Sequence, residues 1–411
     1  MKKRFLSLGL AAIMAASLTA CGGGSKTETT AAPAAAETTA AAEGETAEAA
    51  EGETQAAGGV FKIGGIGPIT GGAAVYGIAV QHGAEIAIKE INAAGGINGC
   101  QVEFQFQDDE HDAEKSVNAY NTLKDWGMQA LVGTVTSAPC IAVADKSAAD
   151  NMFQITPSGS AVECAANPNV FRVCFSDPDQ GAASATYIGE NKLATKVAVI
   201  YDSSDVYSSG IYEKFAQEAS NQGIEIVAAE AFTADSNKDF STQLQKAKDA
   251  GAELVFLPIY YTEASLILQQ ASTMGFETQF FGCDGMDGIL QVENFDVSLA
   301  EGLMLLTPFA ADATDDLTVN FVKSYQDAYG EIPIQFAADA YDAVYAIKAA
   351  IEDAGATPDM SASDLCDAIK ASMLNIKLDG LTGEEMTWTE DGEPHKAPKA
   401  VKVVDGSYAA M

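Results

Sequence analysis

Short apolar segments alternate with longer amphipathic ones through most of this 411-residue chain. The first block of alternation begins at Phe61–Gly83, where an apolar strand leads through a glycine-rich turn into a segment with helical periodicity. A second block begins with Lys196–Tyr201, a continuous apolar run typical of a strand buried on both faces. This pattern predicts an α/β fold with two doubly wound parallel sheets. A small ligand is expected in the cleft between them, beyond the carboxyl ends of the strands.

Local patterns predict several individual elements. Residues Cys140–Asp150 are expected to be helical, and Asp177 is expected to cap the helix that follows it, with a proline just inside. The segment Gly302–Leu306 is expected to cross back to the first domain. The tail, Glu385–Val404, predicts a hairpin around Glu390–Gly392.

The first 59 residues are expected to lie outside the folded body. A basic start is followed by the apolar run Phe5–Ala20, which indicates a secretory signal. The sequence before Cys21 resembles a bacterial lipobox, which predicts residues 1–21 as a lipoprotein signal and Cys21 as the lipidated residue. An ordinary signal peptide with an incidental cysteine is the alternative. Residues 22–59 lack aromatic residues, Ile, Leu, Val and Met, which predicts a disordered tether.

Composition excludes several functions. With 58 acidic and 23 basic residues the formal net charge is −35, which argues against binding nucleic acid or an anionic membrane surface. The sequence has no GxSxG, no phosphate-binding P-loop, no HExxH, and no GxGxxG followed by a suitably spaced acidic residue. Its three histidines are isolated from one another. We therefore expect neither an enzyme nor a cofactor or metal site.

Two features leave alternatives open. The run Asp108–Asp112 has the residue types of a metal site, but it also fits a solvated acidic turn in which Asp112 caps the next helix. Cys164 and Cys174 are close enough in sequence to form a disulfide in an exported protein, and they could equally be buried free thiols.

The turns after several strands carry the groups that an α-amino acid requires. A carboxylate needs hydroxyls and helix N-terminal N–H groups, and an ammonium needs a carboxylate in a dry site. Thr136 and Ser137 offer hydroxyls at a helix start, and Asp284 follows an apolar strand in the second block. Equivalent turns offer further hydroxyls and accessible backbone at Ser158, Gly159 and Ser160, and aromatic rings at Tyr76, Tyr207, Tyr260 and Tyr261. Helix capping by Ser137, a simple Asp-Gly turn at Asp284, and core packing by the tyrosines are the structural alternatives.

Extended stretches of the chain resemble the leucine/isoleucine/valine-binding protein family, the type I solute-binding proteins of ABC importers. The resemblance spans about Phe61–Ala410. It is carried by FKIGGIGPITGGAAVYG, GAEIAIKEINAAGGING, FRVCFSDPDQG, TADSNKDFSTQL, YYTEASLILQQASTMGFETQFFGCDG and DGLTGEEMTWTEDGEP.

The resemblance implies a role for each candidate residue. Ser137, flanked by Val135 and Thr136, matches the family's carboxylate-binding serine, and Asp284 matches the acidic residue that pairs with the ammonium. A second contact region matches Ser158, Gly159 and Ser160, aromatic pocket positions match Tyr76, Tyr207 and Tyr260, and a weaker match falls on Phe336.

The family also implies a domain organisation and a biological role. Two lobes, 60–177 plus 308–387 and 178–307 plus 388–411, would be joined by three crossovers near residues 175–180, 306–309 and 387–391. The lobes would close on an aliphatic amino acid by hinge motion, and the closed form would deliver it to an ABC permease. The protein is expected to be a monomer, lipid-anchored at the outer face of the cytoplasmic membrane.

The chain departs from the family pattern at three places. Leucine-type members have Glu where this chain has Asp284, and many relatives with Asp have a Trp at the position of Met286. His111 and Thr136 occupy the positions of a disulfide found near the first ligand turn. The ligand's identity therefore stays open. A sensor or regulator of the same fold, binding an amide, a urea derivative or an aromatic acid, is the alternative.

Overall fold

The computed structural model describes residues 58–411. The predicted signal segment, Cys21 and all but the last two residues of the predicted tether lie outside this range. Within it, no helix is both long enough and apolar enough to cross a membrane.

The first sheet is wholly parallel and contains five strands in the order β2-β1-β3-β4-β5. The strands are β1 Val60–Gly67, β2 Gln101–Asp108, β3 Ala130–Gly133, β4 Phe153–Thr156 and β5 Val170–Arg172. The helices that connect or cover them are α1 Ala74–Ala93, α2 Ala113–Trp126, α3 Ser137–Asp150, α8 Asp316–Tyr329, α9 Gln335–Ala354 and α10 Ala362–Met373. The predicted βα alternation of the first block is confirmed.

The second sheet has seven strands in the order β14-β13-β10-β9-β8-β6-β7. Its parallel part comprises β6 Lys196–Asp202, β7 Glu225–Phe232, β8 Leu254–Leu257, β9 Gln279–Gly282 and β10 Met304–Thr307, with the helices α4 Asp177–Glu190, α5 Val206–Ala219, α6 Ser241–Asp249 and α7 Tyr261–Thr273. Unlike the prediction, the sheet is mixed, because β13 Lys399–Val404 and β14 Ser407–Ala410 form a hairpin that adds antiparallel strands to β10. The segment near Gly302–Leu306 belongs to the second sheet, where β10 pairs with β9, and the chain crosses to the first domain directly after it.

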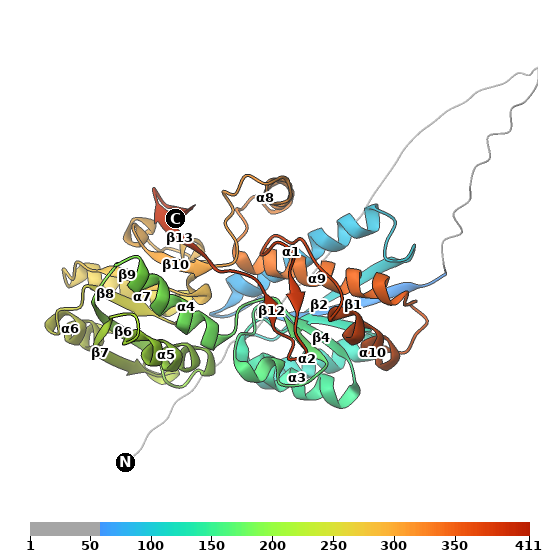
Figure 1. The fold of residues 1–411 in the computed structure, drawn as a ribbon, viewed down its shortest axis with the longest axis horizontal. Helices are drawn as coiled ribbons and strands as arrows, with labels where there is room; N and C mark the ends of the chain where they lie inside the picture. The colour runs from blue at the N-terminus through green and yellow to red at the C-terminus, as the bar shows by residue number, and fades with distance from the viewer. Residues whose placement is uncertain (1–57) are drawn as a thin grey trace, which may run out of the picture. The chain divides into compact units, whose positions relative to one another are not determined.

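The chain passes between the two sheets three times, after β5, after β10 and near its end. The predicted tail hairpin is present as β11 Thr387–Trp388 paired with β12 Pro394–His395. This hairpin stays with the first sheet, because Arg172 N donates to Gly392 O and Trp388 Nε1 donates to Arg172 O. The third passage, predicted at residues 387–391, therefore falls later, between β12 and β13, as the red C-terminal segment in Figure 1 shows.

Side chains cap the starts of helices α2 and α4, and only the first of these two caps was predicted correctly from the sequence. Asp112 caps α2 as predicted, because its side chain accepts from the N–H groups of Glu114 and Lys115. The N-cap of α4 is Ser176 and not Asp177, since the Ser176 side chain accepts from Asp179 N. Helix α3 begins at Ser137, three residues before the predicted start. Proline at the third helical position is compatible with this start because the first N–H groups of a helix have no partner within it.

The cysteines at 164 and 174 are both buried free thiols, so no disulfide joins them. The Cys164 thiol donates to Ser137 O, and it lies beside Cys140 in a small buried cluster. The thiols therefore act as apolar packing groups behind the first-sheet turns.

Helices α1 and α9 pack at very close range in the main hydrophobic core. A Cβ atom added at Gly83 in α1 would lie 2.0 Å from the carbonyl oxygen of Ala337 in α9. The absence of a side chain at Gly83 thus allows the two backbones to approach, and this approach sets the position of the N-terminal part of α9.

We predict that Gly83→Ala lowers the free energy of unfolding by about 1–3 kcal/mol, because the methyl group forces α1 and α9 apart. The effect opposes the gain in helix propensity of about 1 kcal/mol that alanine brings. Chemical denaturation measures the difference. Gly72→Ala is the control, since a Cβ there meets no atom within 4 Å. Equal or greater stability of Gly83→Ala would contradict the packing argument.

Candidate functional site

A closed cavity lies where the carboxyl ends of the two sheets meet. It is lined by Tyr76, Val135, Thr136, Ser158, Ser160 and Phe336 from the first-sheet side and by Tyr207, Tyr260, Asp284 and Gly285 from the second. Every candidate site residue named from the sequence except Ser137, Gly159 and Tyr261 lines it. Only about 10 Å³ of the cavity could hold the centre of a water-sized sphere. That is room for roughly one water molecule, so a larger ligand requires the walls to move apart.

Asp284 is the buried carboxylate of this cavity. It begins the short helix η3 (Asp284–Met286), directly after β9. Its Oδ1 accepts from the Tyr207 hydroxyl at 2.8 Å and from Gly285 N at 2.6 Å, and its Oδ2 accepts from Gln180 Nε2 at 3.0 Å. Burial raises the pKa of Asp284 to about 6, although these hydrogen bonds oppose the rise. At neutral pH the cavity therefore holds a negative charge.

Hydroxyl groups face Asp284 from the first sheet, and their hydrogen bonds distinguish them. Ser158 Oγ donates to Val135 O at 2.6 Å, and Thr136 Oγ1 lies 2.8 Å from His111 Nδ1. Ser160 Oγ lines the cavity and makes no hydrogen bond of normal length, although it lies beside the buried carboxylate of Asp177 and lowers the pKa of that group. The Ser160 hydroxyl can rotate from this carboxylate towards a ligand.

Ser137 lies behind the cavity wall. Its Oγ accepts from the N–H groups of Ser160 and Ala161, at 3.2 and 3.1 Å, so its side chain shapes the 158–161 turn. Helix α3 starts at this residue, and the Thr136 side chain makes no capping hydrogen bond. The uncapped N-terminus of α3 is therefore directed at the same region, where its N–H groups and dipole favour an anion.

Aromatic rings close the cavity from both sides. Tyr76 stacks on Phe336 with centroids 4.2 Å apart, and Tyr207 stacks on Tyr260 at 4.8 Å. The Tyr76 hydroxyl also donates to Gly285 O and accepts from Tyr261 N, which joins α1 to turns of the second sheet. The walls are thus largely apolar, and the contacts of Tyr76 hold the two sides together.

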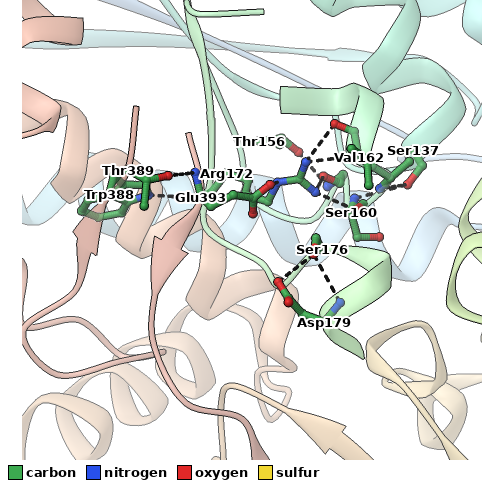
Figure 2. Close-up of polar contacts among 12 residues, drawn as sticks. Ser137, Thr156, Ser160, Val162, Arg172, Ser176, Asp179, Trp388, Thr389 and Glu393 are labelled. Atoms are coloured by element: carbon green, nitrogen blue, oxygen red, sulfur yellow. Dashed lines mark hydrogen bonds and ion pairs between the residues drawn. The ribbon is translucent and has the colours of Figure 1, made fainter. Parts of the chain in front are cut away.

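Arg172 supports the turn beside the cavity, and this role was not predicted from the sequence. It is fully buried, and its guanidinium donates to four consecutive carbonyls, those of Gly159, Ser160, Ala161 and Val162. Its Nε lies 3.2 Å from Glu393 Oε1 on the tail hairpin. Figure 2 shows this arrangement, with Arg172 between the Ser160 turn and Glu393. The sequence held a signal, because Arg172 is the only arginine besides Arg4 and it interrupts an apolar strand.

Lys396 was also not predicted as a site residue. It lies in the segment between β12 and β13, where the chain passes between the sheets for the third time. Its side chain is fully buried, with Nζ 3.3 Å from Asp339 Oδ1, 3.0 Å from Thr382 Oγ1 and 5.2 Å from the centre of the Phe175 ring. Its positive charge also lowers the pKa of Asp284. Lys396 therefore helps to keep Asp284 ionised from behind the cavity.

Within the part of the chain that the structure describes, no group of three or more His, Cys, Asp or Glu side chains is placed to hold a metal ion. The Asp108–Asp112 run forms a turn. Asp108 accepts from Ile69 N and Thr70 Oγ1, and Asp112 caps α2. The residues that line the cavity include no Lys, Arg or His, so its one formal charge is that of Asp284.

One parallel and one mixed sheet, three connecting passages and a closed cavity between the strand ends define a bilobal solute-binding fold. The chain belongs to the periplasmic binding protein family, whose model matches residues 60–407. A Brucella melitensis protein named Leu/Ile/Val-binding protein homolog 3 is 33% identical over 310 residues, covering 75% of this chain and 83% of that protein.

Two further relatives agree with this assignment. The leucine-, isoleucine-, valine-, threonine-, and alanine-binding protein of Pseudomonas aeruginosa is 31% identical over 334 residues, which cover 80% of this chain and 87% of that protein. The crystal structure of the branched-chain amino acid transporter substrate-binding protein LivJ from Streptococcus pneumoniae, in complex with isoleucine, superposes with a TM-score of 0.78 at 28% identity. The match covers 86% of this chain and 99% of that one.

We predict that Arg172→Lys lowers the free energy of unfolding by about 3 kcal/mol or more. The lysine ammonium cannot reproduce the planar fork, so carbonyls of residues 159–162 lose their donors in a buried site. Urea denaturation measures the loss. Lys323→Met removes one member of an exposed ion pair with Asp327 and should change stability by less than about 1 kcal/mol. If the two variants were equally stable, Arg172 would not be holding the turn.

Proposed function

We propose that this protein is an extracytoplasmic receptor of an ABC importer and that it binds an α-amino acid with an aliphatic side chain. The proposal rests on one observation: a carboxylate lies on one side of the closed cavity, and hydrogen-bond donors lie on the other. Asp284 stands on one side, and Ser160 Oγ and the N-terminus of α3 stand on the other. This pairs a carboxylate with the ligand's ammonium, and hydroxyl and N–H donors with its carboxylate.

Each predicted site residue has a role in this proposal. Val135, Thr136, Ser158, Gly159 and Ser160 form the turns that receive the ligand's carboxylate, and Ser137 supports them from behind. The rings of Tyr76, Tyr207, Tyr260 and Phe336 form the wall for the ligand's side chain. The lack of a cationic residue in the cavity lining disfavours a ligand with a second carboxylate. No chemical change of the ligand is proposed.

The transport role rests on family membership together with the names of the relatives. In this proposal residues 1–20 are removed and Cys21 then carries a lipid anchor. Residues 22–59 act as a tether, and the body acts as a monomer. Closure captures the amino acid, and the closed form docks on a permease in the cytoplasmic membrane.

Isothermal titration calorimetry on protein that has been unfolded, freed of carried-over ligand and refolded tests the ligand class. Leucine, isoleucine, valine or alanine should bind, and benzoate and acetamide should not. Binding of an aromatic acid or an amide, with no response to any amino acid, would replace this proposal with the sensor alternative.

We predict that Asp284→Asn weakens amino-acid binding by at least about 30-fold, or about 2 kcal/mol, because the ligand's ammonium loses its charged partner in a dry cavity. Calorimetry measures the dissociation constant. Glu301→Gln removes an exposed carboxylate from the same half of the protein and should leave it unchanged. Unchanged affinity in Asp284→Asn would place the ammonium contact elsewhere.

We predict that amino-acid affinity is constant near pH 7–8 and falls below about pH 6. The pKa of Asp284 is about 6 without ligand, and the ligand's ammonium favours the ionised form. Protonation of Asp284 therefore competes with binding, and the affinity falls by up to about tenfold per pH unit in this window. Titrations from pH 4.5 to 8 measure the slope. Other buried carboxyls, including Asp339, titrate in the same range. The slope must therefore flatten in Asp284→Asn if Asp284 is its source.

A further inference from the structure

A second cavity, with a volume of about 600 Å³, lies on the far side of the turn that carries Asp284. Its walls come from the turn after η3, the segment after β10, helix α8 with the loop that follows it, and the β13–β14 hairpin. The apolar part of the wall includes Leu290, Phe309, Val322, Ile332, Ile334 and Val401. In size and in apolar character this cavity fits a small-molecule site better than the closed cavity does in its present state.

The charges on its wall have one sign. Asp287, Asp312 and Glu331 line the cavity, and no Lys, Arg or His does. Asp312 and Glu331 are accessible to solvent, whereas Asp287 is only 5% exposed. The site therefore offers one buried carboxylate within an apolar wall.

Asp287 has hydrogen-bond donors, but no cation lines its cavity. Its Oδ2 accepts from Gln335 N at 2.8 Å, and the hydroxyl of Tyr408, which also lines the cavity, lies beside the carboxylate and lowers its pKa by a hydrogen bond. Burial nonetheless raises the pKa of Asp287 to about 6, so it is ionised at neutral pH. A buried carboxylate that no positive charge compensates is unfavourable, and a cation arriving from the cavity relieves this.

We propose that this cavity binds a small hydrophobic amine, with its ammonium on Asp287 Oδ1 and its alkyl or aryl body against the apolar wall. The ammonium provides charge and donors together, and a charge-assisted hydrogen bond in such a site is strong. Tyr408 Oη accepts a second N–H of the same ammonium. A carboxylic acid is excluded, because three carboxylates and no cation face the cavity.

The site differs from the amino-acid site in both chemistry and position. It presents no set of donors for a ligand carboxylate, so it selects an amine that lacks one. Asp287 lies three residues after Asp284, and Gln335 contacts both, donating its backbone N–H to Asp287 and its Nε2 to Asp284 O. The two carboxylates nonetheless line separate cavities.

Calorimetry with 3-methylbutylamine and 2-phenylethylamine on the full chain tests this site. The Asp284→Asn variant is titrated in parallel, so that binding at the first cavity does not contribute. Both proteins should bind the amines with similar affinity, and 3-methylbutanol, which has the same body without the charge, should bind at least tenfold more weakly. The result does not depend on whether the first cavity binds an amino acid.

Two variants locate the binding. Asp287→Asn retains an acceptor for Gln335 N but removes the charge, and it should weaken amine binding at least tenfold. Ala311→Phe fills the cavity from its wall without changing Asp287, and it should abolish binding. Circular dichroism and the melting temperature show whether each variant is folded. Absence of amine binding at millimolar concentration, equal binding of the alcohol, or binding that survives both variants would overturn the proposal.

Discussion

The ionised carboxylate of Asp284, held in an almost dry cavity, is the constraint on which the rest of the site depends. Burial of a charge is unfavourable unless hydrogen bonds and opposite charges compensate for it. Here Gln180 in α4 and Tyr207 in α5 supply donors, and Lys396 supplies a positive charge from behind. The turn that carries Asp284 is also held from the first-sheet side, where Gln335 donates to its carbonyl. The charge is thus maintained by elements of both sheets.

Arg172 donates hydrogen bonds to buried backbone carbonyls, as these groups do to the Asp284 carboxylate. Four carbonyls of one turn accept from a single guanidinium, so that turn is fixed by side-chain chemistry where regular secondary structure is absent. The N–H groups of Ser160 and Ala161 are engaged from the opposite side by Ser137. With both the N–H and C=O groups occupied, the Ser160 hydroxyl is the polar group of this turn that is left for a ligand.

The parts of the fold that follow from local periodicity could be predicted from the sequence. The strand predicted at Lys196–Tyr201 is present as β6 and ends one residue later, because a continuous apolar run between turn residues leaves little choice. The β13–β14 hairpin and its antiparallel pairing with β10 were not predicted, since the order of strands in a sheet depends on contacts between residues far apart in sequence. The cap at Ser176 was missed for a smaller reason, because Asp177 and Ser176 are both good capping residues and only geometry selects between them.

Membership of the cavity lining could be predicted for residues that have a suitable polar group and directly follow a strand. Asp284 and Ser160 are of this kind. The structure separates Ser137 from the cavity because its hydroxyl is used by backbone N–H groups, and sequence does not reveal such a competition. Arg172 and Lys396 were missed because a buried cation depends on partners far away in the chain, Glu393 for one and Asp339 for the other.

The closed cavity also explains how selection and release can be combined. Its lining side chains are mostly buried, and it has room for about one water molecule, so a ligand enters only when the two sides separate. This separation breaks several hydrogen bonds, including those from the Tyr76 hydroxyl to Gly285 O, from Tyr261 N to Tyr76 Oη and from Thr262 Oγ1 to Gly72 O. Each contributes only about 1 kcal/mol, because water replaces it in the open form. A ligand that satisfies Asp284 and Ser160 together gains most of its interactions in the closed state, and it is this difference that shifts the population towards closure.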